Sequence, residues 1–209
     1  MSWLQGLPDP LRDRERSERS RGERDIGVAI GIPEPYGREL QGWREQLGDP
    51  NAKRIVPHVT LLPPTPVDDS SLPAIEEHLR KVAADEDTFE IILRGSATFL
   101  PVSPVVFVPL VQGISECERL EEKVRSGPLD REVRFPYHPH VTVAHDLPPD
   151  ALRRAFDAIR GYEASFRVWG FTLFEQDVDG TWRPQRDFVF GGGGVPGPDP
   201  APRRYDDGW

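Results

Sequence analysis

The sequence has a single cysteine, no long apolar run and no excess of positive charge, and each absence excludes a class of protein. The single Cys117 leaves no partner for an internal disulfide and excludes a cysteine-based metal site, so we interpret it as an inert small residue. The longest apolar stretch, residues 105–111, is interrupted by Pro109 and is far too short to cross a bilayer. The N-terminal residues show no apolar core of a signal peptide. We therefore expect a cytoplasmic protein that contacts no membrane.

The charge balance limits the partners that the chain can bind. Its formal net charge is −9. A protein that coats a nucleic-acid backbone gains affinity from an extensive positive surface, and this chain lacks one overall. We therefore expect any nucleic acid that it meets to be a short piece or an end, held in a local site, and we expect the protein to act as a monomer.

Composition divides the chain into three segments. Residues 1–24 are rich in arginine and glutamate with almost nothing to bury, which predicts a disordered charged arm. Residues 191–209 begin with glycines and continue with prolines, which predicts a flexible tail. Residues 25–190 carry periodic apolar patterns, so we expect them to form one domain made of two lobes.

Strands and helices alternate within this domain. Apolar residues at three- and four-residue spacing predict helices over residues 35–47, 72–84, 114–124 and 150–159. Strands are predicted over residues 26–32, 55–62, 89–93, 105–110 and 140–144. Residues 166–176 and 182–190 are predicted to form a hairpin around Asp179-Gly180. This mixture predicts an α+β fold in which helices pack on sheets.

Two copies of Pro-His-Val-Thr, at residues 57–60 and 139–142, are the most informative segments. Alternate side chains of a strand point to the same face, so His58 projects beside Thr60, and His140 beside Thr142. Because the chain has only five histidines, chance predicts well under one His-x-Thr. The duplication therefore indicates function, and it suggests two related lobes that face each other.

Paired histidines suit the cleavage of a phosphodiester. Histidine takes and gives protons near neutrality, so His58 and His140 can serve as general base and general acid on opposite sides of phosphorus. The hydroxyls of Thr60 and Thr142 are placed to donate hydrogen bonds to the non-bridging phosphate oxygens. This scheme needs no metal and no cofactor. The residues do not say which histidine is the base.

These two His-x-Thr motifs, in a chain of this size, resemble those of the 2H phosphoesterase superfamily, which includes the bacterial 2′-5′ RNA ligase family and cyclic phosphodiesterases. The resemblance covers residues 25–190. It implies a bilobal α+β fold with pseudo-twofold symmetry, in which two antiparallel sheets face a central cleft and helices pack outside. It implies His58 and His140 as catalytic residues, Thr60 and Thr142 as substrate-binding residues, and 2′,3′-cyclic phosphates or 2′-5′ linkages of nucleotides or RNA ends as substrates, without metal.

Two alternatives compete with this interpretation. The same cleft can be a binding module that recognises a phosphorylated nucleotide or RNA end without turnover. A zinc site built from His138, His140 and His145 is the other alternative, but strand parity predicts that His145 faces away from the cleft. His78, in a charged helix, is expected to be exposed.

Secondary contacts with the substrate are also suggested by the sequence. Aromatic residues that are candidates for stacking on a base are Tyr36, Phe99 and Trp169. Cationic residues near the motifs that are candidates for local positive potential are Lys53, Arg54, Arg131 and Arg134.

Overall fold

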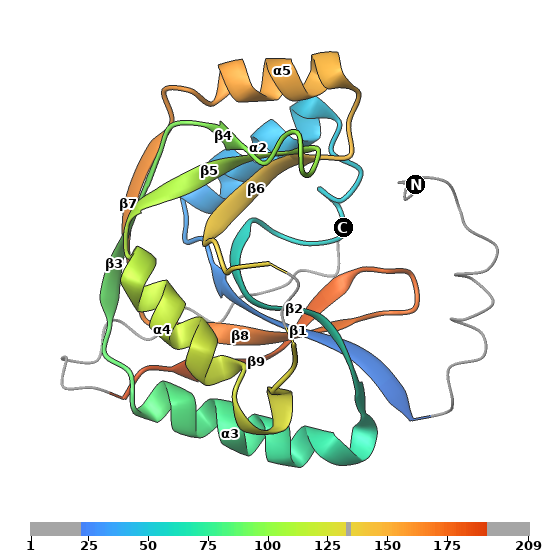
Figure 1. The fold of residues 1–209 in the computed structure, drawn as a ribbon, viewed down its shortest axis with the longest axis vertical. Coiled ribbons are helices and arrows are strands. Elements are labelled where there is room, and N and C mark those ends of the chain that lie inside the picture. Colours follow the sequence, from blue (N-terminus) through green and yellow to red (C-terminus); the bar gives the residue numbers. More distant parts are fainter. Residues whose placement is uncertain (1–21, 133–134, 192–209) are drawn as a thin grey trace.

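Antiparallel strands form the framework of the protein in a computed structural model that describes residues 22–132 and 135–191. The sheet runs in the order β7-β3-β5-β6-β2-β1-β8-β9, with the short β4 paired to β5. Figure 1 shows that the sheet is strongly curled. Its strands are β1 (Glu23–Gly31), β2 (His58–Asp68), β3 (Phe89–Arg94), β4 (Ala97–Thr98), β5 (Val105–Gln112), β6 (His140–His145), β7 (Glu163–Val168), β8 (Gly170–Gln176) and β9 (Trp182–Val189).

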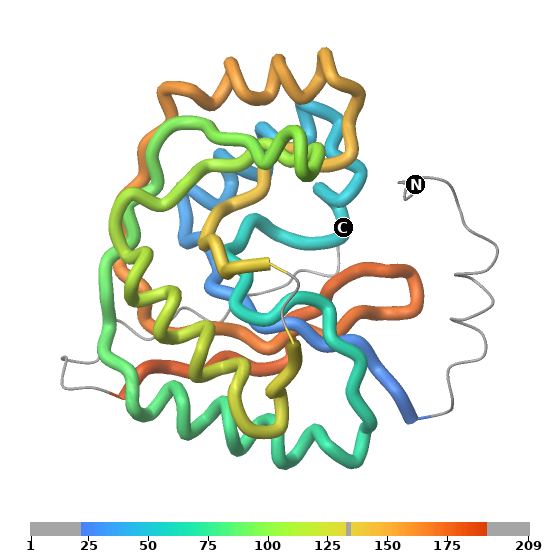
Figure 2. Tube along the Cα trace, in the orientation of Figure 1, coloured from blue at the N-terminus to red at the C-terminus, as the bar shows by residue number. Residues whose placement is uncertain are grey.

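The sheet consists of two halves that meet at one pair of residues. β7, β3, β5 and β6 form the first half, and β2, β1, β8 and β9 form the second. Val59 of β2 pairs with Val141 of β6, and this is the one pairing in the described residues that joins the halves. Strands from opposite ends of the sequence lie side by side, as β1 and β8 do in Figure 2.

In the part of the chain that the structure describes, four α-helices cover the outside of the two halves, and two of them pack on the half to which they do not belong in sequence. These helices are α2 (Tyr36–Leu47), α3 (Leu72–Ala84), α4 (Ile114–Val124) and α5 (Pro149–Ala158). α2 connects β1 to β2 yet packs on β6, and α4 connects β5 to β6 yet packs on β2. α5 joins α2 on the first half, and α3 lies on β9 of the second (Figure 1). This exchange gives the two lobes related topology and confirms the bilobal α+β prediction.

The helices follow from the apolar spacing in the sequence. Ile75, Leu79 and Val82 share one face of α3 and are buried in the core. α2 ends at Gly48, whose φ of 76° places it in the left-handed region that glycine adopts without strain. The predicted ends of α3 and α4 coincide with the observed ones.

The predicted hairpin is confirmed, since β8 pairs with β9, but its first strand is shorter than residues 166–176 because the chain divides there into β7 and β8. β7 pairs with β3 in one half of the sheet, and β8 pairs with β1 in the other. The division falls at Trp169-Gly170. A Cβ on Gly170 would lie 2.1 Å from the carbonyl oxygen of Phe188, so the close approach of β9 requires glycine at this crossing.

The ends of the domain lie slightly outside the predicted boundaries. β1 begins at Glu23, and Arg24 pairs with Asp69 and Glu175, so Glu23 and Arg24 belong to the sheet rather than to the arm expected over residues 1–24. The amide of Gly191, assigned to the tail over 191–209, donates to the carbonyl of Ala83 in α3 at 3.1 Å. The rest of both predicted tails lies outside the described residues. Within the described ranges, no helix has the length and apolarity needed to span a membrane.

Candidate active site

The two His-x-Thr motifs form one array at the junction between the halves of the sheet. Because Val59 pairs with Val141 in an antiparallel ladder, His58 lies opposite Thr142 and Thr60 lies opposite His140. All four side chains are half-buried and share one face, whereas both valines are fully buried on the other. The structure therefore brings together the four residues that the sequence singled out.

The two histidines occupy one diagonal of this array. Diagonal neighbours across an antiparallel pair lie about 7 to 8 Å apart, a span that a phosphate group with its attacking and departing oxygens can fill. The two rings also interact electrostatically, because the charge of protonated His140 contributes to lowering the pKa of His58. The array thus offers one phosphate two imidazoles and two hydroxyls.

Both imidazoles are oriented by the same kind of hydrogen bond. Nδ1 of His58 lies 2.8 Å from the carbonyl oxygen of Val56, and Nδ1 of His140 lies 2.7 Å from that of His138. A carbonyl only accepts, so Nδ1 of each ring carries the proton and donates it. Nε2 of each neutral ring consequently holds the free lone pair, which is the state that a general base requires.

The two histidines differ in their electrostatic surroundings. Burial, which is the largest cause, and the Arg44 guanidinium together lower the pKa of His58 to about 4, despite the opposing effect of the hydrogen bond to Val56. Burial is also the main cause that lowers the pKa of His140, and the charge of the neighbouring His138 adds to it. Both rings are therefore neutral at pH 7 in the free protein, and the permanent charge of Arg44 acts on the pKa of His58.

Aromatic rings pack around His140. The Phe99 ring meets it edge-on at 4.9 Å between centroids and 89° between planes, and Phe107 lies at the same centroid distance. Phe99, one of the three stacking candidates, is thus at the array. The other two lie elsewhere: the Tyr36 ring contacts Phe166 in the core, and Trp169 contacts the Arg167 guanidinium.

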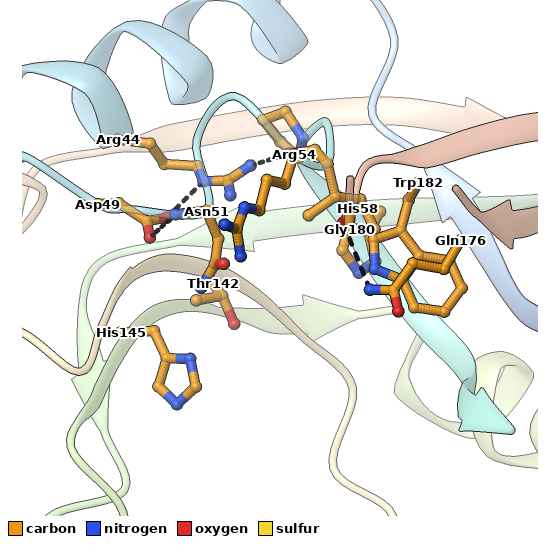
Figure 3. A pocket seen from close by; sticks show the side chains of 12 residues that line it. Arg44, Asp49, Asn51, Arg54, His58, Thr142, His145, Gln176, Gly180 and Trp182 are labelled. Carbon is orange, nitrogen blue, oxygen red and sulfur yellow. Dashed lines mark hydrogen bonds and ion pairs between the residues drawn. The ribbon is translucent and has the colours of Figure 1, made fainter. Parts of the chain in front are cut away.

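A pocket of about 270 Å³ opens beside the array on the side of His58 and Thr142 (Figure 3). Arg44 and Asp49 form its buried wall, with Nε of Arg44 donating to Asp49 Oδ2 at 2.8 Å. Nη1 of Arg44 also donates to the carbonyl of Ile55, just before the motif. The lining residues are Arg44, Asp49, Asn51, Arg54, Ile55, Pro57, His58, Thr142, His145, Gln176, Gly180 and Trp182.

His145 lines this pocket, so the prediction that it faces away was wrong. The ladder between β5 and β6 shifts register: Phe107 pairs with Thr142 but Val106 pairs with Ala144, which leaves Val143 as an extra residue in β6. A bulge of this kind inverts the alternation of the residues that follow it. The alternation of side chains counted from His140 therefore no longer predicts the direction of His145.

The proposed zinc cluster of His138, His140 and His145 is not assembled. Within residues 22–132 and 135–191, no group of three or more His, Cys, Asp or Glu side chains is arranged to hold a metal ion. The His138 ring lies 6.3 Å from that of His140 and contacts Phe99 and Phe107. His78, expected to be exposed, is half-buried, and its Nε2 binds the carbonyls of Lys123 and Val124 at the end of α4.

The cationic candidates separate into one that reaches the pocket and others that do not. Arg54 lines the pocket, whereas Lys53 is exposed beside it and Arg131 donates to the carbonyl of Pro66. Arg134 lies outside the described residues. Sequence reasoning missed Arg44, Asn51 and Gln176, because nothing in their local pattern shows that α2, the loop after it and a distant hairpin converge on His58.

Known proteins are similar to this chain in sequence and in fold. The model of the 2′-5′ RNA ligase superfamily matches residues 32–180. Proteins of Geobacillus sp. (strain WCH70) and Oceanobacillus iheyensis, both provisionally named phosphoesterases, are 31% and 30% identical over 168 and 167 residues. These alignments cover 79% of this chain and 96% and 97% of the relatives. E. coli LigT, solved in complex with NADP⁺, superimposes with a TM-score of 0.61 at 22% identity over 81% of this chain and 99% of its own.

Proposed function

Because this chain belongs to the 2′-5′ RNA ligase superfamily and is an enzyme of the 2H phosphoesterase type, we propose that it cleaves 2′,3′-cyclic phosphates or 2′-5′ linkages at nucleotide or RNA ends, with His58 and His140 as its acid–base pair. The observation that carries the proposal is the joint array of the two motifs around Val59 and Val141. Solved complexes of LigT with 3′-AMP and with ATP support a nucleotide as the ligand class.

The array suits hydrolysis by in-line attack. A water molecule on one side of phosphorus loses a proton to one Nε2 while its oxygen bonds to phosphorus. The bond to the departing ribose oxygen breaks on the other side, and that oxygen takes a proton from the second imidazole. The hydroxyls of Thr60 and Thr142 donate to the non-bridging oxygens, where negative charge grows in the transition state. In the ligation direction the two imidazoles exchange these roles.

We assign the base of hydrolysis to His58 and the acid to His140. The permanent charge of Arg44 disfavours the protonated form of His58, which keeps its Nε2 free to accept a proton from water. No permanent cation lowers the pKa of His140, so the negative charge of a bound phosphate favours its protonated form more readily, and the proton comes from solvent. At the start of hydrolysis, His58 is therefore neutral and His140 is protonated.

A substrate screen tests the proposal. The protein is incubated with nucleoside 2′,3′-cyclic phosphates, 2′-5′ dinucleotides and RNA that ends in a cyclic phosphate, with and without EDTA, and the position of the product phosphate is determined by chromatography. We expect cleavage of at least one class at an unchanged rate in EDTA. Tight binding in calorimetry without any product would instead support a binding module, and inhibition by EDTA would support a metal-dependent reaction.

A further inference from the structure

The pocket beside His58 contains more positive charge than its own residues neutralise. Arg44 and Asp49 are 4% and 1% exposed and form a closed pair, so neither charge is available to a ligand. Arg54 also lines the pocket, and no carboxylate of the described residues forms an ion pair with it. In a protein of net charge −9, this leaves a local cation facing the pocket.

Arg54 belongs to the outer wall of the pocket. The loop that carries it is fixed to the β8–β9 hairpin, because the amide of Trp182 donates to the carbonyl of Arg54 at 2.8 Å. A Cβ on Gly180, at the tip of that hairpin, would lie 3.8 Å from Nη1 of Arg54. Arg54 is therefore placed to meet a different part of the ligand from the phosphate at the array.

Trp182 provides a flat apolar surface in the same wall. Its ring packs over Gly27, where an added Cβ would lie 3.3 Å from the ring. The half-buried indole also lines the pocket, together with the carboxamide of Gln176 (Figure 3). An indole face stacks on any nucleobase without sequence preference, so this wall offers a base a platform next to a cation.

We propose that Arg54 and Trp182 form a second subsite, in which the Arg54 guanidinium binds the 5′-phosphate of the nucleotide whose 2′,3′-cyclic phosphate lies at the array. This inference rests on the proposed function. A guanidinium binds phosphate by paired, charge-assisted hydrogen bonds. The volume of about 270 Å³ is near the lower end for small-ligand pockets, so it suits one nucleotide rather than a longer segment. The preferred substrate is thus a 5′-phosphorylated nucleotide or the last nucleotide of an RNA, not a bare nucleoside cyclic phosphate.

Two matched substrates test the subsite. Values of kcat/KM are measured for adenosine 2′,3′-cyclic phosphate with and without a 5′-phosphate, in the wild type, in Arg54→Gln and in the control Lys53→Gln. Lys53 is the adjacent, exposed residue of the same loop and does not line the pocket, so its replacement removes the same charge without touching the subsite. We expect the 5′-phosphate to raise kcat/KM about tenfold or more in the wild type and in Lys53→Gln, and this ratio to fall toward one in Arg54→Gln.

Equilibrium binding keeps the inference testable without turnover. Calorimetry compares adenosine 2′,5′-bisphosphate with adenosine 2′-monophosphate on the same three proteins, and the bisphosphate should bind about tenfold more tightly unless Arg54 is replaced. The subsite would be overturned if the wild type bound the two ligands with equal affinity, or if Lys53→Gln and Arg54→Gln lost affinity for the bisphosphate equally. Cleavage of both cyclic phosphates would still leave the proposed function intact in either case. Selective binding without any cleavage would reject the proposed function and retain the subsite.

Discussion

Val59 of β2 pairs with Val141 of β6, and through this pair the two halves of the sheet share a single surface that carries the four side chains of the His-x-Thr motifs. The valines are fully buried on one face, so the residues on either side of each valine must face the opposite way. A one-residue slip would turn the histidines into the core and the valines toward the pocket. The register that buries two small apolar side chains is thus the same register that assembles the site.

Removal of either threonine hydroxyl should slow the reaction without unfolding the protein. Thr60→Val and Thr142→Val keep the side-chain shape but delete a donor to the non-bridging oxygens, so we expect kcat to fall about 10²- to 10³-fold. Thr88→Val, which removes a hydroxyl that contacts Arg167 at the surface of the sheet, is the control and should leave kcat unchanged. A wild-type kcat in both motif variants would show that the hydroxyls do not stabilise the transition state.

The pH profile of kcat/KM should have its maximum on the acid side of neutrality. The profile reports the free enzyme, in which His58 must be neutral and His140 protonated. Burial and Arg44 lower the pKa of His58 to about 4, so the acid limb lies near pH 4. The pKa of His140 is lowered, mainly by burial, from the ordinary histidine value of 6.5, so activity falls again before pH 6.5. Initial rates between pH 3.5 and 8 measure both limbs, and an optimum above pH 7 would contradict the assignment.

Acid should destabilise the protein partly through His58. The pKa of about 4 in the folded protein lies below the ordinary histidine value of 6.5, so between these two pH values the unfolded chain binds a proton that the folded protein does not. The free energy of unfolding therefore falls as the pH is lowered through this window, and His58 contributes nothing to this slope above it. Urea unfolding at several pH values should show a shallower decline in His58→Gln. Parallel declines in the two proteins would indicate that His58 titrates normally.

The buried pair of Arg44 and Asp49 should matter to the fold as well as to the site. Arg44→Met leaves the Asp49 carboxylate buried without its cation, which we expect to lower the free energy of unfolding by about 3 to 5 kcal/mol. The double variant Arg44→Met/Asp49→Leu should recover much of this loss. Arg38→Met, at an exposed residue paired with Glu34 at 3.7 Å, is the control and should change stability by less than about 0.5 kcal/mol. If the double variant were as unstable as Arg44→Met, the unpaired Asp49 carboxylate could not be the cause of the lost stability.

The array could be predicted from sequence because its determinants are local. The alternation of His58, Val59 and Thr60 fixes which side chains share a face, and the repeat around His140 fixes the second strand. The apolar spacing likewise predicted the helices, including both ends of α3 and α4. These features depend on residues within a few positions of one another, so no knowledge of the tertiary fold was needed.

The pocket could not be predicted because its residues meet through long-range structure. The bulge at Val143 depends on how β6 pairs with β5, and it alone turns His145 toward the pocket. Trp182 reaches the pocket only because β8 pairs with β1, which the predicted strand over residues 166–176 did not anticipate. Arg44 looks like a surface residue at the end of α2 until the loop with Asp49 folds over it.

A double-mutant cycle on the two histidines tests most directly whether both act on the same phosphate. The rate of 2′,3′-cyclic phosphate hydrolysis is measured for His58→Ala, His140→Ala and the double variant, with circular dichroism as the check on folding and His78→Ala as a control distant from the array. Because base and acid act in one step, each single change should cost about 10²- to 10⁴-fold, and the double variant should be no slower than the worse single one. Near wild-type activity in either single variant, or losses that multiply in the double variant, would contradict the account.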